Sequence, residues 1–209
     1  MRRPEVTLQT LRLLNQSLAE QVDGPALREL VDHQARAIGM MGDLKRGRTV
    51  RSLCYLMRHY EGVRLVFIAP KEFAMERDIK SFLDQHRIPY VETTELASVL
   101  PDLDALYVTR MQTEWDTAGE SRAVDLRPFS IGTHELTLLK HDAFIMHPLP
   151  RGPEIDPLVD HDPRAMYWRQ ERNGMWMRVA VLIKIFGVER SVTALAAAEN
   201  PPPPPGMPA

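Results

Sequence analysis

The 209-residue sequence is short of several features, and each shortage excludes a class of protein. Its single cysteine, Cys54, excludes an internal disulfide and a cysteine-based zinc site, and it fits a reducing cytoplasm. No apolar run approaches the ~20 residues of a membrane span, and the N-terminus lacks the apolar stretch of a secretory signal. The net charge of −2 argues against nucleic acid or an anionic membrane as a partner. We therefore expect a cytoplasmic protein without nucleic-acid or membrane partners.

What the sequence does contain is a regular alternation of short apolar runs with amphipathic stretches. Such alternation is typical of a three-layer αβα domain of the α/β class, with a mostly parallel, Rossmann-like sheet. Thr133 is expected to be the N-cap of the helix predicted at 133–140. The pattern predicts strands at 35–42, 63–70, 88–93, 105–112 and 143–150, and helices at 49–60, 75–87, 95–104, 133–140 and 163–187.

Both ends of the chain differ from this α/β pattern. Residues 1–34 form an N-terminal helical segment, in which leucines at 8, 11, 14 and 18 share one stripe. The α/β domain is expected over 35–190. Residues 191–209 include five consecutive prolines and are expected to be a disordered tail.

Three predicted strands end in segments with ligand-binding chemistry. The segments are 45–49, which is rich in Lys and Arg, 109–112, and the His-Pro-Leu-Pro-Arg turn at 147–151. In open α/β sheets, ligands bind beyond the carboxyl ends of the strands. Arginine matches a carboxylate with two parallel hydrogen bonds, so Arg48 and Arg110 converging on one crevice would suit a small dicarboxylate. Prolines stiffen the third segment, which would present backbone carbonyls to an amine.

Plainer interpretations of the same residues stay open. A basic loop is usually a solvated surface, Arg110 would be satisfied by an internal acid such as Glu114, and His147 is more often structural than catalytic. A nucleotide-binding P-loop requires lysine where Arg48 stands and a later strand that ends in aspartate, and the sequence has neither. The remaining candidates are interpreted as residues of the core or of a contact between domains. They are Cys54, Trp168, Met175, Trp176 and Met177.

Five stretches together resemble the aspartate-binding half of aspartate carbamoyltransferase. They are "GDLKRGRTVRSL", "FIAP", "LYVTRMQTE", "MHPLPRGPEI" and "DPRAMYWRQERNGMWMRVAVL", which occur in the family's order between residues 38 and 187. The turn His147-Pro148-Leu149-Pro150 also separates the sequence from the ornithine enzymes, which usually carry a cysteine in this turn. The resemblance implies the second-domain fold of the aspartate and ornithine carbamoyltransferases, with residues 1–34 as a remnant of the bridge between domains.

The resemblance also implies roles for individual residues. Arg48 and Arg110 would clamp the two carboxylates of L-aspartate, Gln112 would assist, and Pro148 and Leu149 would offer carbonyls to the amine and the carbamoyl nitrogen. Lys45, Thr49, His147 and Arg151 would support them. In the family, the amine of aspartate attacks carbamoyl phosphate and yields carbamoyl aspartate, a step of pyrimidine biosynthesis. This reaction needs no cofactor, no metal and no protein nucleophile.

The sequence departs from the family in one large respect. The half that binds carbamoyl phosphate has no counterpart here, and two basic or histidine positions of the family carry Trp115 and Arg51 instead. The chain would therefore hold half a site. It is expected to be inactive alone and to need a carbamoyl-phosphate-binding chain or a homo-oligomer; the alternative is a non-catalytic module that binds a dicarboxylate or assists assembly.

Overall fold

The computed structural model describes residues 37–112, 116 and 124–199. The chain divides into two compact units: His33–Glu171, and Met1–Asp32 together with Arg172–Ala209. The helical segment predicted at 1–34, with its leucine stripe, lies outside the described residues, as does the proline run that begins at 201.

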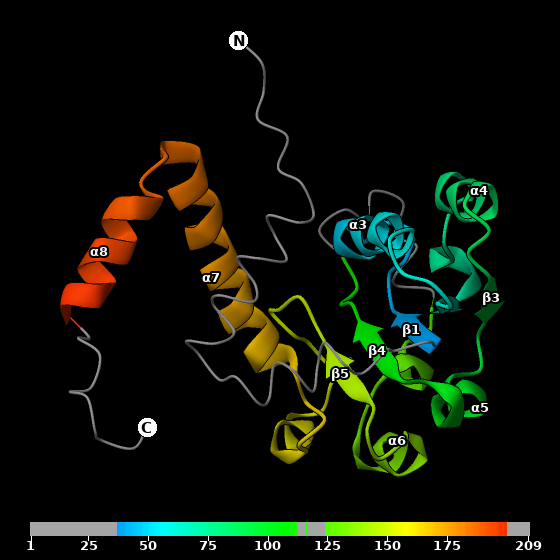
Figure 1. Cartoon of the computed structure of the whole chain (residues 1–209). Coiled ribbons are helices and arrows are strands. Elements are labelled where there is room, and N and C mark those ends of the chain that lie inside the picture. The colour runs from blue at the N-terminus through cyan, green and yellow to red at the C-terminus, as the bar shows by residue number, and fades with distance from the viewer. Residues whose placement is uncertain (1–36, 113–115, 117–123, 200–209) are drawn as a thin grey trace. The chain divides into compact units, whose positions relative to one another are not determined.

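The first unit is built on a five-stranded parallel sheet with the strand order β3-β2-β1-β4-β5 (Figure 1). Its register pairs Met41 of β1 with Ile68 of β2 on one side and with Val108 of β4 on the other. All five predicted strands are confirmed, and so is the parallel α/β class. The strands are β1 (Ala37–Met41), β2 (Arg64–Ile68), β3 (Tyr90–Thr93), β4 (Ala105–Val108) and β5 (Phe144–Met146).

Helices cover both faces of this sheet, as Figure 1 shows. Helices α3 (Arg48–Met57) and α4 (Arg77–Gln85) lie over one face, and α5 (Leu96–Val99) and α6 (Thr133–Leu138) lie over the other. Short 3₁₀ turns complete the unit at Lys71–Phe73, Leu100–Asp102, Arg127–Phe129 and Pro157–His161. The chain continues into α7 (Tyr167–Phe186) and α8 (Glu189–Glu199).

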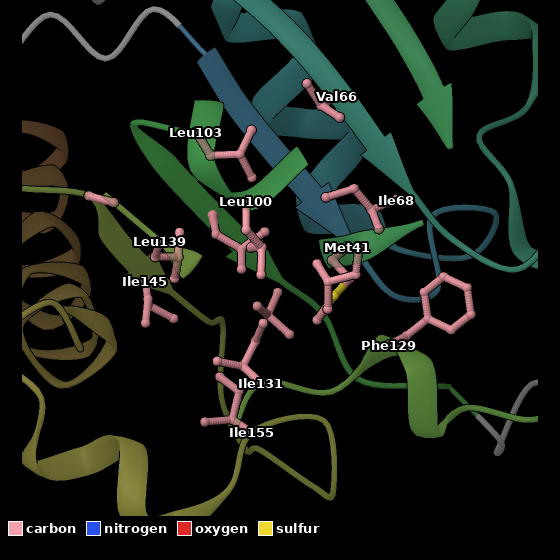
Figure 2. Close-up of a cluster of buried hydrophobic side chains, with 14 of the residues drawn as sticks. Met41, Val66, Ile68, Leu100, Leu103, Phe129, Ile131, Leu139, Ile145 and Ile155 are labelled. Atoms are coloured by element: carbon pink, nitrogen blue, oxygen red, sulfur yellow. The ribbon is translucent and has the colours of Figure 1, made fainter. Parts of the chain in front are cut away.

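The core consists of two apolar clusters, one on each face of the sheet. Along β1, Ile38 and Met40 join the cluster under α3 and α4, whereas Ala37 and Met41 join the opposite one. Figure 2 shows the second cluster, in which Met41, Val66 and Ile68 of the sheet face Leu100 and Leu103. Burial on both faces explains why the strands read as nearly continuous apolar runs. Residues 37–41 of β1 are buried without exception.

Some predicted boundaries need correction. The strands predicted at 105–112 and 143–150 end at Val108 and Met146, because the segments beyond them turn away as loops. Thr133 is not the N-cap of α6: Gly132 holds that position, and the Glu135 carboxylate accepts its N–H at 2.9 Å. Between β4 and α6, where no element is predicted, a 3₁₀ turn occupies Arg127–Phe129.

The prediction of disorder from residue 191 is wrong for 191–199, which belong to α8. This segment is rich in alanine, the residue with the highest helix propensity, and only the prolines that follow are incompatible with a helix. The core interpretation is also wrong for Trp168, Met175 and Trp176, which are 50%, 47% and 38% exposed. A contact with another domain or chain stays a prediction for them.

Candidate functional site

Three neighbouring strands, β1, β4 and β5, end at the same edge of the sheet because all strands are parallel. The chain leaves β1 toward β2 on one side, while β4 lies on the other side of β1. Such a switch point is where open α/β sheets bind ligands. The segments 45–49, 109–112 and 147–151 follow these three strands directly, so the topology brings the predicted site segments to one edge.

The segment after β4 begins against the end of β1. The Thr109 N–H donates to the carbonyl of Met41, the last residue of β1, at 2.8 Å, and the Thr109 hydroxyl donates to the same oxygen at 3.2 Å. Gly42 has φ +113°, and a Cβ atom at this position would lie 2.0 Å from the Thr109 carbonyl oxygen. Only glycine combines this backbone angle with so close an approach.

The predicted ligand Arg48 is the first residue of α3, preceded by Gly47 as the N-cap. Arg48 and Thr49 are both exposed. The first N–H groups of a helix lack intrahelical partners and, together with the helix dipole, favour an anion. The start of α3 therefore combines an exposed guanidinium with a backbone environment suited to a carboxylate.

Lys45, expected to support the site, is held by its backbone. Its N–H donates to the Phe73 carbonyl at 3.1 Å, and its carbonyl accepts from Arg51 Nη1 at 3.3 Å. Arg51, which stands where the family often has histidine, also pairs with Glu76 at 3.3 Å and with Asp78. Arg51 thus ties α3 to the start of α4.

Arg110 and Gln112 follow β4 and are both half-buried. Arg110 Nη1 donates to the Met111 carbonyl at 3.4 Å, and the Gln112 N–H donates to Asp43 Oδ2 at 3.3 Å. Glu114, the alternative partner considered for Arg110, lies outside the described residues. The roles of Arg110 and Gln112 as ligands of a carboxylate stay predictions.

Asp43 is a fully buried acid that the sequence-based interpretation missed. Burial raises the pKa of its carboxyl, and this effect outweighs the hydrogen bonds from the backbones of Arg46 and Gln112 and the charge of Arg46. The signal was present in the sequence as an acid directly after a buried strand and glycine. Its partners in the segment after β4 were not evident, because they lie nearly seventy positions away.

The turn after β5 is organised by His147, which is buried, and this burial favours the structural interpretation of the residue. Its Nδ1 accepts the Leu149 N–H at 2.9 Å, so Nε2 carries the proton and donates to Glu154 Oε1 at 2.9 Å. The His147 N–H donates to Gln170 Oε1 at 3.0 Å. Leu149 adopts φ +47°, an uncommon angle for a residue with a side chain, and precedes a cis peptide bond to Pro150.

Glu154 holds this turn by accepting hydrogen bonds from His147 and from the Gly152 N–H. Burial would raise its pKa, but hydrogen bonds from His147 and the Gly152 N–H together outweigh burial, and the net effect lowers the pKa of Glu154. The Gly152 N–H lies 2.6 Å from Glu154 Oε1. The turn that carries Pro148 and Leu149 is therefore fixed by a buried imidazole and a charged carboxylate rather than by a regular strand.

Burial is the largest influence on Tyr107, in β4, and raises the pKa of its hydroxyl, while the side chains of Thr49 and Gln170 act to lower that pKa. Gln170 Oε1 also accepts the His147 N–H of the turn after β5. A supporting role for Thr49 stays a prediction.

Arg151, the last of the predicted supporting residues, is engaged with an acid. Its two terminal nitrogens donate to both oxygens of Asp160 at 2.7 and 2.6 Å, and the Tyr167 hydroxyl donates to the same carboxylate. Its guanidinium carbon also lies 5.9 Å from the ring centroid of Trp168. This paired state favours a structural role, while a role toward a substrate stays a prediction.

A pocket of about 560 Å³ lies beside Arg151, lined by 130–132, 135, 151–153 and 155–157. Of the predicted site residues, Arg151 alone lines it. The pocket therefore does not coincide with the start of α3 or the segment after β4. The switch point is the better candidate for a ligand site, because its exposed guanidinium and helix N-terminus have ligand-binding chemistry. In the pocket, Glu135 and Asp156 already accept backbone N–H groups.

The parallel sheet, the basic loop after β1, the arginine after β4 and the proline turn after β5 match one known domain. A family model described as "Aspartate/ornithine carbamoyltransferase, Asp/Orn binding domain" covers residues 34–185. The chain belongs to this family. The aspartate branch is favoured by every relative and neighbour described below, and the resemblance inferred from the motifs is confirmed.

Relatives of the chain occur in several organisms, as catalytic subunits and within longer proteins. The aspartate carbamoyltransferase catalytic subunit of Clostridium novyi is 39% identical over 158 residues, which cover 76% of this chain and 52% of the relative. The multifunctional protein CAD of Squalus acanthias is 41% identical over 159 residues, or 76% of this chain and 7% of that protein. The chain thus spans about half the length of the Clostridium novyi catalytic subunit.

Solved structures agree with these relatives. The catalytic subunit of M. Jannaschii aspartate transcarbamoylase gives a TM-score of 0.68 at 36% identity, covering 78% of this chain and 53% of that chain. Aspartate transcarbamoylase from Trypanosoma cruzi, in complex with aspartate and phosphate, gives 0.64 at 33% identity, covering 80% and 52%. No helix among the described residues is long and apolar enough to cross a membrane.

Proposed function

We propose that this chain is the aspartate-binding half of an aspartate carbamoyltransferase, in which Arg48 and Arg110 grip the two carboxylates of L-aspartate. The observation that supports this most directly is the contact between the segments after β1 and β4 at the switch point, where the Gln112 N–H donates to Asp43 Oδ2 at 3.3 Å. One loop leads into the exposed Arg48 at the start of α3, and the other carries Arg110 and Gln112.

The proposed reaction is the transfer of a carbamoyl group. The lone pair of the neutral aspartate amine forms a bond to the carbonyl carbon of carbamoyl phosphate, the bond from that carbon to the phosphate oxygen breaks, and the proton lost by the amine passes to the departing phosphate. Backbone carbonyls of Pro148 and Leu149 orient the amine and the carbamoyl nitrogen. Positioning of two reactants contributes up to about 7–11 kcal/mol to lowering a barrier, so such a site needs no protein nucleophile.

The turn after β5 is suited to orienting the amine of the substrate. Carbonyl groups orient an amine only if their direction is fixed, and here the His147 Nδ1 atom holds the Leu149 N–H at 2.9 Å while Glu154 holds the imidazole. The positive φ of Leu149 sets the direction of its carbonyl. The turn therefore resists rotation when a substrate amine binds.

A partner is part of the proposal. The chain spans 52% of the Clostridium novyi subunit, and no segment of its sequence resembles the phosphate loop of the carbamoyl-phosphate half. We propose that a separate chain with this loop, or an oligomer that includes it, completes the site. The Trypanosoma cruzi enzyme has been solved in complex with carbamoyl phosphate and aspartate, the two reactants that the completed site would hold.

The decisive experiment is calorimetry with succinate, a dicarboxylate without the reactive amine, compared with butyrate, which has one carboxylate. We expect succinate to bind more tightly to the purified chain, and we expect Arg48→Ala and Arg110→Ala each to remove that advantage. Equal affinities for succinate and butyrate in the unaltered chain would rule out a clamp for two carboxylates.

The half-length match also favours a second candidate, a non-catalytic module that binds a dicarboxylate or assists assembly of a complete carbamoyltransferase. The two candidates differ in one result. A split enzyme forms carbamoyl aspartate when the chain is mixed with a chain that carries the phosphate loop, whereas the module binds succinate and forms no product under any combination.

A further inference from the structure

Arg46 belongs to the loop after β1 but reaches across to the segment after β4. Its Nη1 donates to the Gln112 carbonyl at 3.4 Å, and its Nη2 lies 3.6 Å from Asp116 Oδ1. Only 14% of the Arg46 side chain and 6% of the Asp116 side chain are exposed. An ion pair so well shielded from water is weakened far less by salt and solvent than a surface pair.

The same guanidinium is anchored in its own loop. The Arg46 N–H donates to Asp43 Oδ1 at 3.0 Å, and Nη1 lies 3.7 Å from Asp43 Oδ2. The guanidinium carbon lies 5.2 Å from the ring centroid of Phe73, which is fully buried. Asp43 thus holds the backbone and the guanidinium of Arg46, and Phe73 packs against the face of the guanidinium. The side chain is therefore held in place where it reaches Asp116.

Gln112 is held at both ends of its backbone by this arrangement. Its N–H donates to the Asp43 carboxylate at 3.3 Å, and its carbonyl accepts from Arg46 at 3.4 Å. Strand β4 ends at Val108, so the sheet ladder does not extend to these positions. Side chains of the neighbouring loop therefore replace the ladder as the support for the segment that carries Arg110 and Gln112.

We infer that Arg46 is a positioning residue that fastens the segment after β4 to the loop after β1. It presets Arg110 and Gln112 for the dicarboxylate, and it does not itself contact the ligand. The inference rests on the proposed function, because the positioning of Arg110 and Gln112 affects binding only if these residues bind the dicarboxylate. The basic residues of this loop then have different roles, because Arg46 faces inward to Asp43 and Asp116, whereas Arg48 is exposed.

The first test is hydrogen exchange on the full chain, without any ligand. In Arg46→Met, we expect the Gln112 amide to exchange about tenfold faster, because the loss of one charged hydrogen bond is worth that factor. Residues of β2 and β3 should keep their protection. Arg77→Met is the matched control, since it removes an exposed arginine at the start of α4 and should leave the Gln112 amide unchanged.

The second test is succinate binding by calorimetry on the same variants. We expect Arg46→Met to weaken binding about tenfold and Arg46→Lys to restore part of the loss, because lysine keeps the charge without the fork. Removal of Arg46 also leaves two shielded carboxylates, so a double-mutant cycle with Asp116→Asn accompanies it. The two substitutions should be clearly non-additive in both exchange and affinity.

The outcomes separate this inference from the proposed function. If the unaltered chain does not bind succinate, the proposed function fails, and exchange at Gln112 still decides whether Arg46 fastens the segment. If the unaltered chain binds succinate and Arg46→Met changes neither exchange nor affinity, the inference is overturned while the proposed function stands. Faster local exchange with unchanged affinity also overturns the positioning role. If Arg46→Met does not fold, Arg46→Lys and Asp116→Asn carry the same comparison.

Discussion

The imidazole of His147 links the backbone of Leu149 to the carboxylate of Glu154, with 2.9 Å from its Nδ1 to the Leu149 N–H and 2.9 Å from its Nε2 to Glu154 Oε1. Both ring nitrogens are thus used inside the protein. His147, next to the proposed amine site, therefore acts by holding the conformation of the turn. Its substitution would first change the stability of the chain and the direction of the carbonyls of Pro148 and Leu149.

Glu154→Gln should destabilise the chain at neutral pH by about 1–3 kcal/mol, because a charged acceptor for His147 and Gly152 is replaced by a neutral one. The folded-state pKa of Glu154 is lowered below its ordinary 4.5. Its contribution is therefore complete above about pH 4.5 and is lost as the pH falls through the lowered folded-state value.

The measurement is urea unfolding of the unaltered chain and Glu154→Gln at pH 7 and at pH 3. The difference in unfolding free energy should shrink at the lower pH. Glu61→Gln, an exposed acid, serves as the control and should change little at either pH. A difference that stays constant across this range would contradict the linkage to Glu154.

Arg110→Ala should weaken succinate binding by about 2 kcal/mol or more, since a bidentate charged contact is lost. Calorimetry measures the change directly, with Arg77→Ala as the control for loss of an exposed arginine. Unchanged affinity in Arg110→Ala would remove this residue from the binding site.

The purified chain alone should form no carbamoyl aspartate from aspartate and carbamoyl phosphate. The reason is that its sequence contains no phosphate loop to hold the second reactant, so the advantage of positioning is lost. Turnover that copurifies with the chain and disappears in Arg48→Ala would contradict this expectation.

Helix α7 should promote self-association. Met175, Val179, Leu182 and Phe186 are 47%, 39%, 52% and 72% exposed and fall within about 60° of one another at 3.6 residues per turn. Leu182→Glu should raise the concentration at which dimers form by about tenfold or more, because burial of a leucine is worth about 1.5–3 kcal/mol. Light scattering reads the change, with Val192→Glu in α8 as the control; a monomer at all concentrations would disprove the prediction.

Cys54 should be inert in the folded chain. It is fully buried, and burial raises the pKa of its thiol to about 12. A thiol reagent should therefore react only on unfolding, so the reaction rate of this single cysteine reports global opening. Rapid labelling of the folded chain at neutral pH would show that the core around Cys54 opens locally.

The sequence by itself determined the order and type of the main elements. Apolar runs separated by amphipathic stretches have one stable arrangement, a parallel sheet covered on both faces, and strands buried on both sides leave a pattern that is readable without coordinates. The same reasoning located the basic, arginine-bearing and proline-rich segments at strand ends. It failed at 191–199, where proximity to a proline run hid the high helix propensity of the alanines.

Only the tertiary structure decided which charged side chains face inward. Arg46 and Arg48 are two positions apart and chemically identical, yet Arg46 lies between Asp43 and Asp116 whereas Arg48 is exposed. Likewise, Arg151 pairs with Asp160, and Gln170 accepts the His147 N–H. A long flexible side chain is directed by the acids and carbonyls that surround it, and these partners lie mainly in loops and turns whose proximity is fixed only when the sheet assembles.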